Sequence, residues 1–197
     1  MNKAHQHEQL ILASGSPRRR ELLTEAGYRF DVMVPAETAE CGVCSNDGPA
    51  GLVAELALRK ARDVAPRAGN GVLVACDTVA ECDGFVLGKP ADAEHAREML
   101  ASLSGREHRV FSGLCVWRLG QGQPRVRVAV TRLRMDRMTG EQLDEYIASG
   151  LWEGKAGAFG FQDRLGWVHI EEGSPSNVVG LPMELLAEML AAIHFSA

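Results

Sequence analysis

The sequence predicts a fold that mixes α-helices and β-strands along the whole chain, of the α/β or α+β class. Short apolar runs typical of buried strands occur at Leu10–Ala13 and again at residues 72–76. Between them, residues 51–65 repeat apolar side chains at helical spacing. Two longer segments with strand character, residues 108–119 and Arg125–Met135, follow in the second half. No internal repeat or linker separates these segments.

Length and composition limit the possible classes of protein. The chain has 197 residues, of which 46% are hydrophobic and 24% charged, enough for one large domain or two small lobes on a shared core. A net charge of −5 argues against nonspecific nucleic-acid binding. No apolar run approaches the roughly 18 residues that span a bilayer. The polar start lacks a signal-peptide core, so we expect a cytoplasmic protein whose residues 1–9 are disordered.

The five cysteines do not suggest a disulfide framework, because their number is odd and no signal segment is evident. Cys41 and Cys44 form a lone CxxC without the second ligand pair that a zinc site needs. A redox pair is an alternative, but free thiols in a polar loop are the better interpretation.

A sharp strand-to-helix turn follows the first strand. Pro17 suits the first helical position, where its missing N–H costs nothing, and Ser16 stands where a hydroxyl can cap the helix. Three arginines occupy the first helical turn: Arg18, Arg19 and Arg20. A helix N-terminus favours negative charge, so these arginines indicate an anion site, with a solvated basic turn as the alternative. The Walker-type Gly-Lys-Ser/Thr is absent.

Two carboxylates follow in a loop over residues 36–49, after a predicted strand at residues 28–35. They are Glu37 and Glu40, either of which is a candidate metal ligand.

Lys60 lies on the apolar stripe of the helix predicted at residues 51–65, while Glu55 and Arg59 pair on its outer face. A lysine that faces a core either extends to the edge or points into a cleft that requires a cation.

Asp77 interrupts the apolar strand that begins at residue 72. A buried carboxylate is costly unless it is paired or binds a metal, so we expect a functional role. The strand then enters a hairpin around Asp83-Gly84, which suits a type I′ turn and leads to Lys89.

The remaining elements are predicted from capping and alternation. Asp92 caps a helix over Ala93–Leu103, and Thr139 with Gln142 forms a capping box. Alternating arginines between residues 125 and 134 predict a solvated, charge-protected edge strand. The other predicted elements are a glycine-rich segment at 150–161, a short strand at 167–170, a tight loop at 173–182 and a last helix that starts at Pro182.

The lysines and arginines singled out above are not required by the fold, and they occur together with the carboxylates of Asp77 and Glu37 or Glu40. Lysines and arginines beside acids suit a polyphosphate bound with a divalent metal, and they indicate phosphate-ester or nucleotide chemistry. Five ordered stretches make the indication specific: LILASGSPRRRELL, ACDTVAECDGFVLGKPADAEHAREML, SGREHRVFSGL, YIASGLWEGKAGAFGFQ and GSPSNVVGLP. Together they resemble the Maf family of nucleoside triphosphate pyrophosphatases, from about Leu10 to the last helix.

The resemblance implies a single Maf-like domain. Its elongated mixed sheet carries flanking helices as two lobes around a central cleft, as in the inosine triphosphate pyrophosphatase group. It implies cleavage of nucleoside triphosphates to monophosphate and pyrophosphate with Mg²⁺ or Mn²⁺, in order to clear noncanonical or excess nucleotides. It also suggests a homodimer.

Residue roles carry over by motif. Asp77 resembles the family's proton acceptor and, with Glu37 or Glu40, is on the metal side of the site. The remaining matches are residues that would bind phosphate: Ser14, Arg18, Arg19, Lys60, Lys89 and Lys155.

Three positions argue for the branch that acts on dTTP and UTP: Arg18 after Ser-Pro, Thr78 after the aspartate, and Gln162 in the glycine-rich stretch. An amide at Gln162 can read a pyrimidine carbonyl and ring N–H together. Departures from the family pattern are Pro175, where an aromatic is frequent, and Asp163, where glycine is usual. The alternatives are the same chemistry on other nucleotides, such as 7-methyl-GTP or CTP, and a non-catalytic regulator of cell division.

Overall fold

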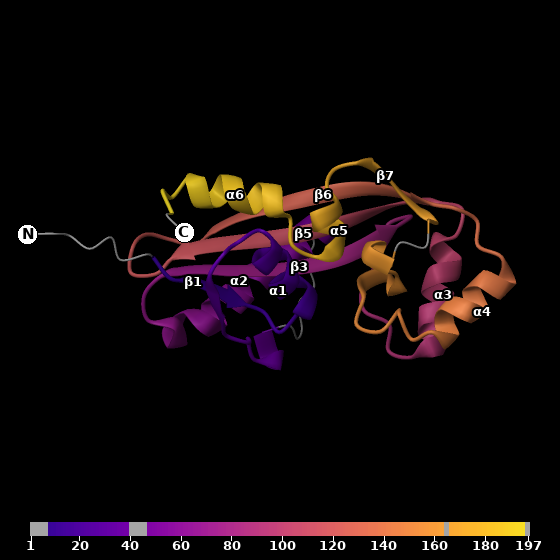
Figure 1. The fold of residues 1–197 in the computed structure, drawn as a ribbon, viewed down its shortest axis with the longest axis horizontal. Coiled ribbons are helices and arrows are strands. Elements are labelled where there is room, and N and C mark those ends of the chain that lie inside the picture. The colour runs from indigo at the N-terminus through magenta and orange to yellow at the C-terminus, as the bar shows by residue number, and fades with distance from the viewer. Residues whose placement is uncertain (1–7, 40–46, 164–165, 196–197) are drawn as a thin grey trace, which may run out of the picture.

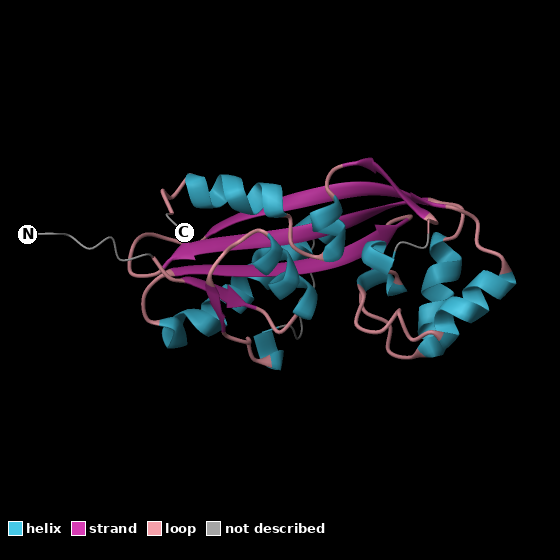
Figure 2. Ribbon diagram, in the orientation of Figure 1, coloured by secondary structure: helices cyan, strands magenta, loops and turns pink. Residues whose placement is uncertain are grey.

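A computed structural model describes residues 8–39, 47–163 and 166–195. A long twisted sheet forms the centre and helices cover it (Figures 1 and 2). The sheet has seven strands in the order β2-β1-β3-β5-β6-β7, with β4 paired to β3. The strands are β1 Leu10–Ala13, β2 Phe30–Val32, β3 Val72–Cys82, β4 Phe85–Leu87, β5 Glu107–Arg118, β6 Arg125–Met135 and β7 Val168–Glu172. Predictions on residues 1–7, Glu40, Cys41 and Cys44 fall outside the described residues.

The sheet is mixed, as predicted. β1 runs parallel to both β2 and β3, whereas the pairs β3–β5, β5–β6 and β6–β7 are antiparallel. The long strands β3, β5 and β6 extend along most of the molecule (Figure 1). They connect a group of helices at one end of the sheet with a second group at the other.

The first helix group encloses β1 and the beginning of β3 from both faces. The helices are α1 Pro17–Glu25, α2 Gly48–Ala68 and α6 Met183–Ala191, while the short α5 Pro175–Val179 lies between the two groups and contacts β5, β6 and η3. Leu10 and Leu12 pack toward α1 and α6, while Ile11 and Ala13 pack toward α2. Coverage of both faces explains why this strand reads as a continuous apolar run.

The second helix group covers the far end of the long strands. It contains α3 Ala93–Leu103, α4 Gly140–Ala148 and the short 3₁₀ turns η2 Ala156–Ala158 and η3 Phe161–Asp163. Leu100, Leu103 and Phe159 pack there against Leu133 and Met135 of β6. This region therefore has its own hydrophobic cluster on the same sheet.

Local signals placed several element boundaries correctly. Asp92 accepts the His95 amide at 2.8 Å, and Thr139 with Gln142 forms the capping box. Asp83 and Gly84 both have positive φ, at 51° and 86°, as a type I′ turn requires.

Other predictions were wrong about where an element ends or whether it forms. The strand expected at 28–35 is only Phe30–Val32, because it pairs with β1 alone. The helix expected to stop at residue 65 continues through Pro66 to Ala68, where a proline in the last turn breaks only one hydrogen bond. The segment at 173–182 contains α5, which Ser174 caps.

β6 is an interior strand over part of its length. Its residues Arg132 to Met135 pair with β7, so the expected free edge is limited to the segment before them. Within the described residues, no helix is both long and apolar enough to cross a membrane.

Candidate active site

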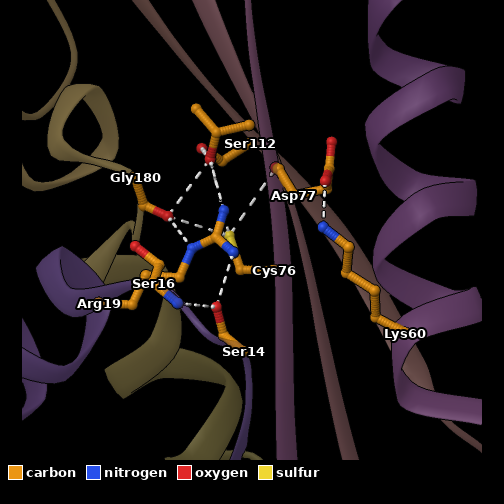
Figure 3. A network of polar contacts seen from close by, with 9 residues as sticks. Ser14, Ser16, Arg19, Lys60, Cys76, Asp77, Ser112 and Gly180 are labelled. Atoms are coloured by element: carbon orange, nitrogen blue, oxygen red, sulfur yellow. Dashed lines mark hydrogen bonds and ion pairs between the residues drawn. The ribbon is translucent and has the colours of Figure 1, made fainter. Parts of the chain in front are cut away.

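A buried ion pair lies at the middle of the sheet. Lys60 Nζ of α2 donates to Asp77 Oδ1 of β3 at 2.5 Å, and the two side chains are only 6% and 13% exposed (Figure 3). The inward direction predicted for Lys60 is confirmed. Asp77 does not interrupt its strand, since β3 continues through it to Cys82.

Gly113 allows α2 to reach this carboxylate. It pairs with Asp77 in the β3–β5 register, and a Cβ at Gly113 would lie 2.1 Å from the Val53 carbonyl oxygen. The helix backbone therefore rests directly on the sheet at this glycine. Lys60 follows Val53 by two helical turns on the same helix face, which brings its ammonium group to Asp77.

Arg19 joins three segments on the other side of β3. Its Nε donates to the Gly180 carbonyl at 2.8 Å, Nη1 to Ser14 Oγ at 3.1 Å and Nη2 to Thr78 Oγ1 at 3.3 Å (Figure 3). The guanidinium is buried, so its planar set of donors fixes α1 against β3 and the loop before α6. Ser16 forms no side-chain cap, and Ser14 Oγ instead accepts the Ser16 amide at 3.2 Å.

Thr78 stands at the centre of this network. Its hydroxyl lies 2.8 Å from Ser112 Oγ and 3.3 Å from the Gly180 carbonyl, in addition to the Arg19 contact. A hydroxyl has one proton and two lone pairs, so these three partners use its full hydrogen-bonding capacity.

Arg18 points toward the second helix group. Its Nη2 donates to the Gly154 carbonyl at 2.7 Å. Burial and the neighbouring Arg19 charge lower the pKa of Arg18 from its usual value. The two adjacent arginines thus contact opposite parts of the molecule.

Lys155, the residue after Gly154, is buried against an acid. Its Nζ lies 2.6 Å from both carboxylate oxygens of Asp163, and the Tyr146 hydroxyl donates to the same carboxylate at 2.7 Å. Burial and this carboxylate raise the pKa of Tyr146 above its usual range, so the phenol stays protonated as a donor.

The other predicted site residues are more exposed. Lys89 follows β4, in a segment bound to η2 by the Gly157 amide and the Gly88 carbonyl at 3.0 Å. Gln162 is exposed on η3, and Glu37 is exposed on η1 Glu37–Ala39. No group of three or more His, Cys, Asp or Glu side chains suited to a metal occurs in the described part of the chain.

Sequence reasoning missed four residues of this region. Gly113 acts through close approach, Gly180 through its backbone carbonyl and Ser112 through a hydroxyl that meets Thr78 across two strands, and none of these leaves a local signal in a single sequence. Asp163 was noted as a departure, but its partner Lys155 was predicted to face phosphate.

Comparison with known proteins now assigns the family. The model of the family described as Maf-like protein matches residues 9–193. The chain belongs to the Maf family. A dTTP/UTP pyrophosphatase of Rhodopirellula baltica is 53% identical over 184 residues, which is 93% of this chain and 81% of the relative. A dTTP/UTP pyrophosphatase of Symbiobacterium thermophilum is 44% identical over 189 residues, which is 95% of each chain.

Solved structures confirm the expected fold at lower identity. A HAM1 protein from Coxiella burnetii superposes with a TM-score of 0.51 at 16% identity, covering 94% of this chain and 99% of that one. The Staphylococcus aureus Ham1 protein gives a TM-score of 0.51 at 12% identity, covering 94% and 97%. The Maf chain therefore has the elongated mixed-sheet fold of the inosine triphosphate pyrophosphatase type.

Proposed function

We propose that this Maf protein hydrolyses dTTP and UTP to the nucleoside monophosphate and pyrophosphate. The names of the relatives at 53% and 44% identity support the substrate class. The single structural observation that supports the chemistry is the Lys60–Asp77 pair, a carboxylate and an ammonium group held together in the centre of a sheet. Such a pair is costly to bury for stability alone.

In the proposed reaction, Asp77 accepts a proton from a water molecule that attacks the α-phosphorus. The bond from that phosphorus to the bridging oxygen breaks, and pyrophosphate leaves. Lys60 orients the carboxylate and supplies positive charge beside it. Hydrolysis of this type depends on positioning and on charge neutralisation at phosphorus.

Phosphate binding is assigned to cations at the start of α1 and after β4. Arg18 lies at the start of α1, where the N-cap residue Ser16 forms no side-chain cap. Ser14 presents its hydroxyl next to this turn, and Lys89 is exposed. Arg19 contributes by holding α1 in place, because its three nitrogens already have protein partners.

A divalent cation fits this donor set if the phosphates supply most of its ligands. Asp77 is one carboxylate, and Mg²⁺ is commonly held by one or two carboxylates with substrate phosphates and water. Glu37 or Glu40 is the candidate for a second carboxylate. When bound, Mg²⁺ or Mn²⁺ would offset charge on the phosphate oxygens.

Base selection is assigned to Gln162 and Arg18, with Thr78 acting through the Arg19 network. We further propose that the two helix groups are lobes of one domain on either side of a nucleotide cleft, and that the protein is a homodimer. The Arg18–Gly154 hydrogen bond, which links α1 to the second group, supports this arrangement.

Pyrophosphate release tests the function directly. Purified protein is assayed with Mg²⁺ or Mn²⁺ against dTTP, UTP, CTP, 7-methyl-GTP and the common purine triphosphates. We expect preferential turnover of dTTP and UTP; a strong preference for another nucleotide would refute the substrate assignment. Absence of turnover with intact nucleotide binding would favour the non-catalytic regulator.

The Asp77 role is tested by Asp77→Asn, which should abolish turnover and retain nucleotide binding. The matched control is Asp83→Asn, six residues further along the chain at an exposed hairpin position that tolerates asparagine. Persistent turnover in Asp77→Asn would contradict the assignment of the proton acceptor.

A further inference from the structure

Asp163 has a buried environment that its position in an exposed turn does not require. Its side chain is 6% exposed and that of Lys155 is 9% exposed. The carboxylate receives the Lys155 ammonium on both oxygens and the Tyr146 hydroxyl on one of them. Tyr146 comes from α4, Lys155 precedes η2, and Asp163 ends η3. We call these three residues the Asp163 clamp.

Gly160 provides the space that the clamp needs. A Cβ at this position would lie 2.5 Å from Lys155 Nζ and 2.8 Å from Asp163 Oδ2. The ammonium and the carboxylate therefore lie directly over the glycine backbone. The Asp163 amide also donates to the Gly160 carbonyl at 3.1 Å, which closes the turn beneath the ion pair.

Packing alone does not hold η3. A cavity of about 200 Å³ lies beside it, lined by Tyr146, Phe159, Gly160, Phe161, Gly166, Trp167 and Val168. An open space next to Phe161 removes part of the contact that would otherwise fix the turn. Besides its contact with α5, η3 is thus held by two directional contacts, the Lys155–Asp163 ion pair and the Tyr146 hydrogen bond.

Gln162 depends on that position. Its side chain is exposed and forms no hydrogen bond with the described part of the chain. The amide oxygen can accept from a thymine ring N–H while the amide nitrogen donates to the neighbouring carbonyl, provided that the amide reaches that base edge. The position of the turn that carries Gln162 sets this reach.

We propose that Asp163 is a positioning residue for base selection, and that the Asp163 clamp fixes η3 at the position from which the Gln162 amide reaches the base edge. The inference rests on the proposed function, in which Gln162 reads the base. The same clamp also holds the segment that binds Arg18, because the Gly154 carbonyl that accepts from Arg18 directly precedes Lys155. Lys155 accordingly serves the clamp, and its charge is matched by Asp163 rather than by phosphate.

Asp163→Asn removes the charge and keeps the shape, whereas Tyr146→Phe removes one hydrogen bond. Asp144→Asn is the control, since Asp144 lies on α4 beside the clamp and forms an exposed ion pair with Arg97. Binding of the α,β-imido analogues of dTTP and dCTP is measured by calorimetry, and kcat and KM are measured with dTTP and dCTP.

We expect Asp163→Asn to lower the dTTP-over-dCTP preference by about tenfold or more, mainly through KM for dTTP, because small misplacements of binding groups have effects up to about 100-fold. Tyr146→Phe should give a smaller loss, and Asp144→Asn none. If Asp163→Asn fails to fold, Tyr146→Phe decides. If a folded variant keeps the wild-type dTTP-over-dCTP preference, the proposal is overturned. This holds even where thermal stability falls, because Asp163 would then only stabilise the fold.

The measurements of analogue binding and of turnover separate this inference from the proposed function. If the wild-type protein binds the dTTP analogue more tightly than the dCTP analogue but turns over neither nucleotide, the proposed pyrophosphatase activity is refuted. The effect of Asp163→Asn on the two analogue affinities then still tests the clamp. Equal binding of both analogues by the wild-type protein would overturn the clamp as a selection device, whatever the turnover.

Discussion

His108 makes the stability of this protein sensitive to mild acid. The side chain lies on β5, 3% exposed, with neither ring nitrogen hydrogen-bonded to the described residues. Its ring meets Phe159 edge-on, with centroids 5.2 Å apart. Burial lowers the pKa of His108 from 6.5 to about 4, against smaller opposing effects of the Arg106 carbonyl and the Glu81 charge. The imidazole is therefore neutral in the folded protein and protonates first in the unfolded chain.

The size of the effect follows from these two pKa values. Between pH 6.5 and pH 4 the unfolded chain binds more protons at this residue, so the free energy of unfolding falls as the pH falls. The full shift corresponds to about 3 kcal/mol, at about 1.4 kcal/mol for each pH unit of difference. About 2 kcal/mol of this is already lost at pH 5, a pH at which carboxylates of ordinary pKa remain largely ionised.

Urea unfolding of the wild-type protein and of His108→Phe, at pH 7 and pH 5, tests the reasoning. Phenylalanine keeps an aromatic ring beside Phe159 and removes the titration. We expect the wild-type protein to lose about 2 kcal/mol more than the variant between the two pH values. An equal loss in both proteins would show that His108 is protonated or solvated in the folded state, contrary to its buried position.

Three further changes test the contacts around the site. Gly113→Ala should displace α2 from β5 and destabilise the protein by about 1–3 kcal/mol, because overpacking against backbone is not relieved by a rotamer change. The free energy of unfolding, measured with denaturant, and the turnover rate should both fall. Unchanged values would refute the close contact. Arg19→Lys should cost about 2–3 kcal/mol and impair turnover, since one ammonium cannot satisfy three separated acceptors; a melting temperature equal to wild type would contradict this. Thr139→Ala should cost about 1 kcal/mol through loss of the capping box and leave turnover intact; a loss of activity would show that α4 positions the site more directly than we infer.

Elements with a local cause were predictable from the sequence. The turn after β1 needs Pro17 at the first helical position, the β3–β4 hairpin needs Asp83 and Gly84 at positive φ, and α4 begins at a capping box. Each depends on residues close in sequence, so a single chain reveals it. The short strand β2 and the helix α5 were predicted wrongly, because their extent depends on partners far along the chain.

By itself, the sequence determined the class of fold, the unusual positions of the charged residues Asp77 and Lys60, and the family resemblance. Apolar periodicity and the cost of burying charge act through single residues and their neighbours, and they can be read without coordinates. Only the tertiary structure decided which charge meets which. It paired Lys60 with Asp77 through the close approach at Gly113, placed Arg19 in a buried network, and brought Lys155 to Asp163. Coulomb and hydrogen-bond energies depend on distances between atoms, and those distances are set by how distant segments pack.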